Sequence, residues 1–269
     1  MGSWAVIGIT SIGDDRCPHG DRRFERFADS AKKSRKYNVR DLDGRAILVQ
    51  PGNIVVYNSI EAELREGSVL VVGLQRDTTN LISGREVNHD NLFSSIDGKG
   101  YAAFLVHPCH MNGSRTYLEE AINNSSNHQL NNITGIEVVN GEAYFPLPWE
   151  YRKANKNALN LFLAAYNFNP NIAPVRFGDG HALFELGRIT TKITYPQLQG
   201  ENGMPNGDAA LKNLKNSFRI LASEFLVARK TASVLEKTVG TLGAVHHGFS
   251  WLVYRPLAMK LGIMTEKDW

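Results

Sequence analysis

The hydrophobic and polar positions along the chain alternate between short apolar runs and longer segments with helical spacing. Several of the short runs are continuously apolar, which is typical of strands covered on both faces. The predicted strands are Trp4–Thr10, Ala46–Val49, Ile54–Tyr57, Val69–Leu74, Ala102–Val106, Gly135–Val139, Ile172–Phe177 and Lys192–Tyr195. The predicted helices between them are Arg22–Tyr37, Asn91–Ile96, Thr116–Asn123 and Tyr151–Asn167. This alternation indicates an α/β fold with a mainly parallel sheet, and the pattern alone leaves open whether the sheet is open or closed into a barrel.

The pattern changes character after residue 207. Apolar side chains recur there at helical spacing, which predicts two helices, Asp208–Ile220 and Ala222–Thr238. Asp208 is the expected N-cap of the first helix. The tail from His246 to Trp269 is rich in aromatic and aliphatic residues, so we expect it to pack on the rest of the chain or on a second copy of it.

Length and composition suit one globular domain with a small appendage. Of the 269 residues 42% are apolar and 21% are charged, with a net charge of +3. We therefore predict an α/β domain over residues 1–206 and a helical extension over residues 207–269 that packs on it and carries the contacts of any homo-oligomer. So mild a charge does not favour nucleic acid or a membrane as a general partner. The basic stretch from Arg22 to Arg45 is diluted by acidic residues, which indicates a solvated helix face.

Three features indicate a cytoplasmic protein. The chain has only two cysteines, Cys17 and Cys109, and such sparse use fits a reducing compartment. The N-terminal apolar run follows no basic segment and precedes no small-residue cleavage site, so it is interpreted as a buried strand and not as a signal peptide. No uninterrupted apolar stretch reaches the roughly 18 residues that a membrane-spanning helix needs.

Histidines supply the first candidate chemistry, which lies where a predicted strand ends. In parallel α/β folds the loops at the carboxyl ends of the strands open onto one face. The strand Ala102–Val106 is followed by His107 and then by Pro108, which cannot donate to the ladder. Imidazole is the commonest metal ligand and a ready acid/base group, and the alternative is a loop histidine without a function. His110 is close enough to reach the same pocket, whereas His89 sits in a polar segment and is expected to be exposed.

An Asp-x-His pair follows the strand Ile172–Phe177. Asp179 and His181 flank a glycine, so a tight turn can point an oxygen and a nitrogen donor at one cation. The alternative is an ordinary turn built from Gly and Asp.

Acidic and amide side chains accompany two other strands. Glu137 falls inside a short apolar strand, where an unpaired carboxylate would be costly, so we expect it to face a polar interior or a basic group. Asn140 lies at the tip of the same strand. Glu61 is either a metal ligand or part of a charged surface turn.

These stretches, taken in order, resemble the motifs of the PHP (polymerase and histidinol phosphatase) family, in particular those of its small stand-alone members. The family pattern has a Glu at a strand end, an "aHP" strand, an "IEVxN" strand and a "GSDAH…IG" strand-turn. The matching residues are Ile60-Glu61, Val106-His107-Pro108, Ile136-Glu137-Val138-Val139-Asn140 and Gly178-Asp179-Gly180-His181 with Leu186-Gly187. The resemblance runs from about residue 4 to residue 220.

The sequence also departs from the family pattern. The family's first strand carries a His-x-His pair, and the N-terminal part of this chain has none. Where the family writes "ITDH", this chain has Ile9-Thr10-Ser11-Ile12, and Gly67-Ser68 stands in place of a "GH" pair. Pro51-Gly52 resembles the family's "PGxE" turn but is followed by Asn53-Ile54. The chain thus resembles a member that begins at the family's second strand.

The resemblance implies a distorted (β/α)7 TIM-like barrel of PHP type, without the first strand, and metal ions at the carboxyl ends of its strands. Family members use two or three Zn, Mn or Fe ions to bind a phosphate and activate water. Carried over residue by residue, the ligands are Glu61, His107, Asp179 and His181, with Asn140 as a fifth. This reduced set fits one divalent ion or none, since a catalytic zinc needs about three protein ligands and an open position. Catalysis would then rest on His107, Asp179 and His181.

Two functions follow from this resemblance. The first is a metal-dependent phosphoesterase that hydrolyses a small phosphorylated substrate or a short nucleotide with metal-activated water. The second is a catalytically inactive PHP-like protein that acts as a binding or structural module, which the missing His-x-His pair favours. A late gene start is a third explanation for that missing pair.

Overall fold

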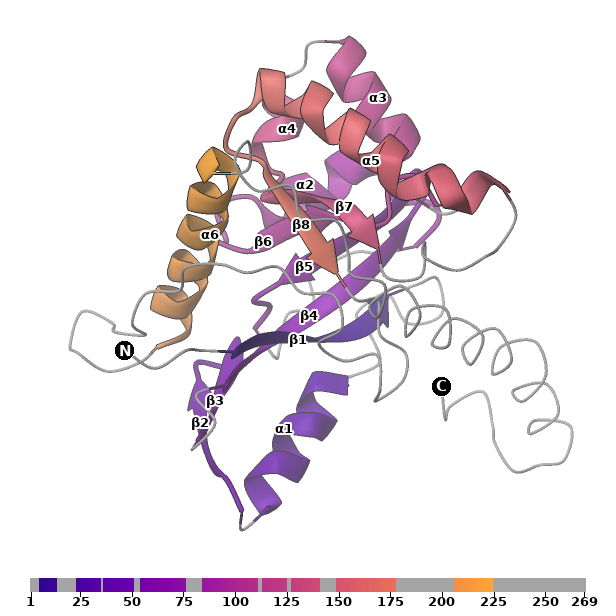
Figure 1. Cartoon of the computed structure of the whole chain (residues 1–269). Coiled ribbons are helices and arrows are strands. Elements are labelled where there is room, and N and C mark those ends of the chain that lie inside the picture. Colours follow the sequence, from indigo (N-terminus) through magenta and orange to yellow (C-terminus); the bar gives the residue numbers. More distant parts are fainter. Residues whose placement is uncertain are drawn as a thin grey trace, which may run out of the picture.

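The computed structural model describes residues 5–13, 23–34, 36–50, 54–75, 84–110, 113–124, 127–140, 149–177 and 206–224. A mixed β-sheet forms the centre of this part of the molecule (Figure 1). Its strands are β1 (Ala5–Gly13), β2 (Asn38–Leu42), β3 (Ala46–Gln50), β4 (Ile54–Leu64), β5 (Gly67–Val72), β6 (Ala102–Leu105), β7 (Gly135–Asn140) and β8 (Ala173–Phe177). The helices are α1 (Arg23–Lys33), α2 (His89–Ile96), α3 (Arg115–Asn123), α4 (Asn127–Asn131), α5 (Trp149–Phe168) and α6 (Gly207–Glu224).

The long strand β4 organises the sheet because it has neighbours on both edges. β1 runs parallel to it from residue 54 to residue 62 and occupies one edge. Both β3 and β5 must therefore lie on the other edge, where they pair antiparallel with residues 54–57 and 59–64. They meet at Asn58, whose N–H donates to the carbonyl of Arg45 and whose carbonyl accepts from Gly73.

The sheet then continues through β6, β7 and β8. The β5–β6 pair is antiparallel, whereas β6–β7 and β7–β8 are parallel. It follows that β1, β4, β6, β7 and β8 all point the same way. Their carboxyl ends meet at one edge of the sheet, and their starts lie at the opposite edge.

The prediction of a distorted (β/α)7 TIM-like barrel is wrong. Of the seven strand pairings in the described residues, those of β2–β3, β3–β4, β4–β5 and β5–β6 are antiparallel, and the sheet there is open. The expectation of a mainly parallel sheet fails for the same reason. The connection between β4 and β5 has two residues, Arg65 and Glu66. A parallel crossover needs about a dozen residues, so such short connections allow only antiparallel neighbours.

The turn between β2 and β3 shows how this antiparallel part is encoded. Asp43 and Gly44 have φ angles of 54° and 68°. Left-handed backbone at two successive residues is typical of a type I′ turn, for which Asp-Gly is a preferred sequence, and the N–H of Arg45 closes the turn onto the carbonyl of Leu42 at 3.1 Å. The hairpin binds to the rest of the molecule through Asp43, whose carboxylate accepts from the N–H of Gly207 at 2.9 Å.

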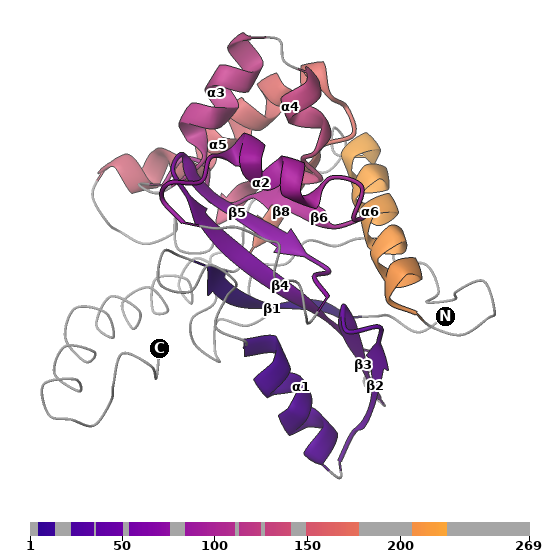
Figure 2. The ribbon, with the colours of Figure 1, turned by 180° about the vertical axis from the view of Figure 1, so that it is seen from behind.

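Helices cover the sheet unequally. In both views α2, α3, α4 and α5 lie together on one side of β5–β8, while α1 lies beside β1 and the β2–β3 hairpin (Figures 1 and 2). The large core joins β3–β8 with α2, α3, α5 and α6, and its largest buried residues include Tyr57, Phe104 and Phe162. A second, smaller core joins α1 to β3 and β4; its members are Phe24, Ala28, Ile47, Val49 and Val56.

Helix α6 belongs to the large core. Leu211, Leu214 and Phe218 are buried in it, and Phe218 packs edge-on against Phe104 at a ring-centroid distance of 5.0 Å. The predicted N-cap was wrong: the side chain of Asn206, not that of Asp208, accepts from the N–H of Ala209 at 2.7 Å. Asp208 instead pairs with Arg45 at 2.9 Å.

The predicted elements otherwise lie near those observed, with four main differences. β4 extends seven residues beyond the predicted end at Tyr57, and α1 ends at Lys33 instead of Tyr37. β2 and α4 were not predicted. The predicted strand Lys192–Tyr195 and the C-terminal tail lie outside the described residues. No described helix is both long enough and apolar enough to cross a membrane.

Candidate functional site at the carboxyl ends of the parallel strands

The carboxyl ends of β4, β6 and β7 bring together side chains that are far apart in the sequence. The Nε2 atom of His107, just beyond β6, lies 3.0 Å from Oε1 of Glu61 in β4, across 46 residues of chain. Both side chains are largely but not fully buried, at 14% and 27% exposure. Glu137 and Asn140 of β7 complete a cluster that we call the carboxyl-end cluster: Glu61, His107, Glu137 and Asn140.

The backbone of His107 is in an unusual conformation. Its φ angle is 31°, in the left-handed region that non-glycine residues rarely adopt, and a proline follows it. Such a residue costs about 1–3 kcal/mol and persists only where the surroundings hold it. Here the N–H of His107 donates to the carboxylate of Glu137. The strained backbone therefore points the imidazole toward Glu61 and the N–H toward Glu137.

Glu137 is the buried centre of the cluster, at 1% exposure. Its second carboxylate oxygen accepts from Nδ2 of Asn140 at 3.2 Å. Donors at both oxygens offset the cost of burying the carboxylate. A bulge between Glu137 and Val139 shifts the register with β8, and such bulges commonly redirect side chains next to functional sites. A backbone N–H and an amide donate to its two oxygens, which fits the expectation of polar surroundings for this carboxylate.

Asn140 is fixed by helix α5. Its N–H donates to Oδ1 of Asn155 at 2.9 Å, and Nδ2 of Asn155 donates back to the carbonyl of Asn140 at 3.4 Å. One amide side chain thus holds both backbone groups at the tip of β7. The side chain of Asn140 remains directed at Glu137.

A tight turn follows His107 and supports its strain. The N–H of His110 donates to the carbonyl of His107 at 2.8 Å, and the N–H of Gly113 donates to the carbonyl of His110 at 3.0 Å. A Cβ atom on Gly113 would lie 2.2 Å from the carbonyl oxygen of His107, so only glycine fits. The rings of His107 and His110 are 5.8 Å apart, which places His110 at the edge of the same cluster.

A hydrogen-bonded chain of Glu66, buried His89 and Ser114 lies behind this turn. Nδ1 of His89 contacts the carboxylate of Glu66 at 3.0 Å, and its Nε2 contacts Oγ of Ser114 at 2.9 Å. The ring stacks on Tyr117 at 4.2 Å. The expectation of an exposed His89 was wrong, since the side chain is fully buried. Burial lowers the pKa of His89, against the opposing effect of its bond to Glu66.

Three of the predicted ligands therefore lie close together. Glu61 contacts His107 directly, and Asn140 is connected to His107 through Glu137. Asp179 and His181 lie outside the described residues. Within the described part of the chain, no group of three or more His, Cys, Asp or Glu side chains is arranged to hold a metal ion. Glu137 was not among the predicted ligands; the signal that could have found it was a carboxylate inside an apolar strand.

Comparison with known proteins gives a fold but no family. No protein-family model matches the chain, and no curated protein matches it. Among solved structures, the crystal structure of PsfC from Pseudomonas syringae PB-5123 is similar, with a TM-score of 0.53 and 12% sequence identity. The match covers 83% of this chain and 77% of PsfC. At that identity the likeness shows a shared fold alone.

Proposed function

We propose that the protein is a metal-dependent phosphoesterase with a reduced metal site, whose ligands are residues of the motifs that resemble those of the PHP family. The observation that carries this proposal is the convergence of Glu61, His107 and Asn140 at one edge of the sheet. These residues come from three separate motifs and were selected as ligands from the sequence.

The ligand set needs Asp179 and His181 in addition. Glu61 and His107 alone fall below the roughly three protein ligands of a catalytic zinc site. In the sheet, Phe177 at the end of β8 is the register partner of Asn140. Asp179 and His181 follow Phe177 by two and four residues in the sequence and lie outside the described residues. The proposed ligands of the ion are Glu61, His107, Asp179 and His181.

A bound Zn, Mn or Fe ion would supply a water molecule of lowered pKa and a positive charge for a phosphate group. The residues of the chain would do the rest. Glu61 and His107 would hold the ion, and Glu137 would hold the backbone of His107 without touching the ion. The substrate class is a small phosphorylated compound or a short nucleotide.

A second candidate function is a catalytically inactive binding or structural module. The observation that favours it is that the cluster is hydrogen-bonded within itself: His107 with Glu61, and Glu137 with Asn140. A cluster of this kind stabilises the strand ends without any ion.

Metal content distinguishes the two functions. The purified wild type is analysed for metals alongside His107→Ala and Asp179→Ala, with the exposed residue change Asp29→Ala as the matched control. The phosphoesterase proposal expects about one equivalent of metal in the wild type and control, and loss of metal in both site variants. A wild type that stays empty after incubation with Zn, Mn and Fe would reject it in favour of the binding module. Metal retained in both site variants would reject the proposed ligands.

A further inference from the structure

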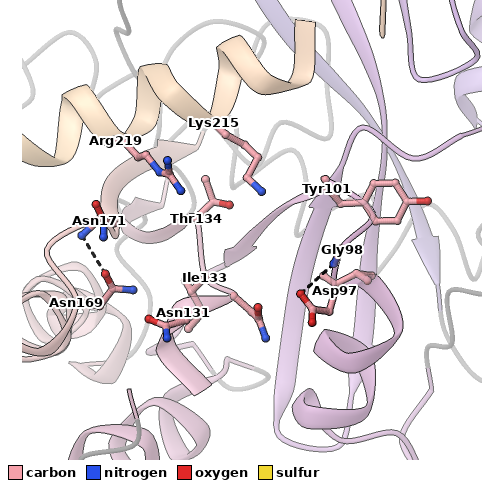
Figure 3. Close-up of a pocket in the computed structure, with 13 residues that line it drawn as sticks. Asp97, Gly98, Tyr101, Asn131, Ile133, Thr134, Asn169, Asn171, Lys215 and Arg219 are labelled. Carbon is pink, nitrogen blue, oxygen red and sulfur yellow. Dashed lines mark hydrogen bonds between the residues drawn. The ribbon is translucent and has the colours of Figure 1, made fainter. Parts of the chain in front are cut away.

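A polar cavity lies at the opposite edge of the sheet from the carboxyl-end cluster (Figure 3). Its volume is about 310 Å³, and its walls are the segments that lead into β6, β7 and β8: residues 96–101, 131–134 and 169–171. Lys215 and Arg219 of α6 complete the lining. Strands of four to six residues separate the two edges by roughly 13–20 Å, so the cavity is a site of its own.

The cavity carries a concentrated positive charge. Lys215 and Arg219 are four residues apart on α6, and Figure 3 shows both side chains extending from that helix toward the loop that holds Thr134. Like charges at this spacing destabilise a helix. Among the described residues neither cation forms an ion pair. Among the described lining residues Asp97 is the one carboxylate, and it accepts from the N–H of Gly98 at 2.9 Å.

Lys215 is also held in a place that disfavours its charge. Burial lowers its pKa, and the neighbouring Arg219 lowers it further. An anion between the two side chains would reverse both effects, because it replaces lost hydration and cancels the repulsion. Half-buried Lys215 and exposed Arg219 thus offer two positive charges to an anion at the mouth of the cavity.

The cavity wall is pre-formed. Asn169 donates through Nδ2 to the carbonyl of Leu130 at 3.0 Å and accepts from the N–H of Asn171 at 3.0 Å. The backbone of Thr134 bonds β6 and β8 together, through Ala103 at 2.8 Å and Ala173 at 3.0 Å. These bonds fix the loops before any ligand arrives, and a pre-organised wall lowers the entropic cost of binding.

We propose that this cavity binds a small phosphorylated compound, with its phosphate group between Lys215 and Arg219. A cavity of about 310 Å³ is at the lower end of the range for small-molecule sites. The amide side chains of Asn131, Asn132 and Asn171 border the remaining space and can bond to hydroxyl groups of the ligand. The site takes no part in the metal chemistry at the other edge.

Inorganic phosphate is the probe for a first test. Thermal unfolding and titration calorimetry are run at constant ionic strength, with chloride replaced stepwise by phosphate and with a chelator present throughout. The variants are Lys215→Gln and Arg219→Gln, with Lys212→Gln, an exposed lysine on the same helix, as the matched control. His107→Ala reports on the opposite edge.

The proposal expects phosphate to raise the unfolding temperature of the wild type, Lys212→Gln and His107→Ala. In Lys215→Gln and Arg219→Gln phosphate should bind about tenfold more weakly or not at all, since each loses a charge-assisted hydrogen bond. Absence of a phosphate effect in the wild type overturns the proposal. So does an effect that survives in both cavity variants, or one that is lost only in His107→Ala. Because the chelator removes metal, none of these results depends on the phosphoesterase activity.

Discussion

Charged side chains have different surroundings at the two ends of the parallel strands. At the carboxyl ends of the parallel strands, Glu137 is buried and each of its carboxylate oxygens meets a donor. At the starts of the same strands, Lys215 and Arg219 face a cavity and have no ion-pair partner among the described residues. The donors at both oxygens of Glu137 offset the cost of burying its charge. Lys215 is half-buried and Arg219 is exposed, and like charges at this spacing on a helix repel each other weakly.

The largest expected effect on stability comes from a change at the centre of the carboxyl-end cluster. Glu137→Ala leaves the N–H of His107 and the amide of Asn140 without their acceptor in a buried place. We expect a loss of about 3 kcal/mol in the free energy of unfolding, measured by urea denaturation. The exposed change Glu120→Ala on α3 is the control and should cost less than about 0.5 kcal/mol. Equal effects of the two changes would show that Glu137 is not an organising residue.

The next effect concerns the turn behind His107. Gly113→Ala places a Cβ against the carbonyl of His107, and we expect a loss of about 2 kcal/mol from overpacking. Gly98→Ala is the contrast, because a Cβ there meets nothing within 4 Å and only the φ of 69° resists it. That strain costs about 1 kcal/mol. A Gly113→Ala protein as stable as the wild type would contradict the close approach.

Buried His89, behind the turn, should make the stability of the protein depend on pH. Because the pKa of His89 is lower in the folded state, the unfolded chain binds more protons below its usual pKa near 6.5. Stability contributed by neutral His89 is present above that pH and is lost as the pH falls, with a slope of at most about 1.4 kcal/mol per pH unit. His89→Gln should flatten the profile between pH 7 and pH 5 in denaturation experiments. An unchanged slope in the variant would assign the acid sensitivity to other groups.

The smallest expected effect is a gain in stability from a change at the cavity. Lys215→Met removes one of two repelling charges, so it should raise the free energy of unfolding by up to about 0.5 kcal/mol in phosphate-free buffer. Lys212→Met on the exposed face of α6 should change stability less. A Lys215→Met protein that is clearly destabilised would mean that the lysine is already paired, and the contrast between the two edges would fail.

The predicted barrel is wrong, whereas the predicted ligand set stays a prediction, because Asp179 and His181 lie outside the described residues. His107 and Asn140 could be selected because each follows or ends an apolar strand, and Glu61 was selected from the resemblance to the PHP family. Glu137 could have been added, since a carboxylate in an apolar strand needs donors. The sequence also contains signals of the antiparallel part of the sheet. Asp43-Gly44 is typical of a hairpin turn, and apolar and polar residues alternate from Ile60 to Leu64 as in a strand.

What the sequence alone determined is local: the positions of most strands and helices and the polar residues at their ends, because side-chain periodicity and turn residues act over a few positions. The tertiary structure alone decided which strands became neighbours and in which direction. It also decided that His89 is buried and that Lys215 and Arg219 face a cavity. These properties depend on packing between distant segments. The sequence of α6 contains two lysines and an arginine, but it does not say which of them face solvent and which face a cavity.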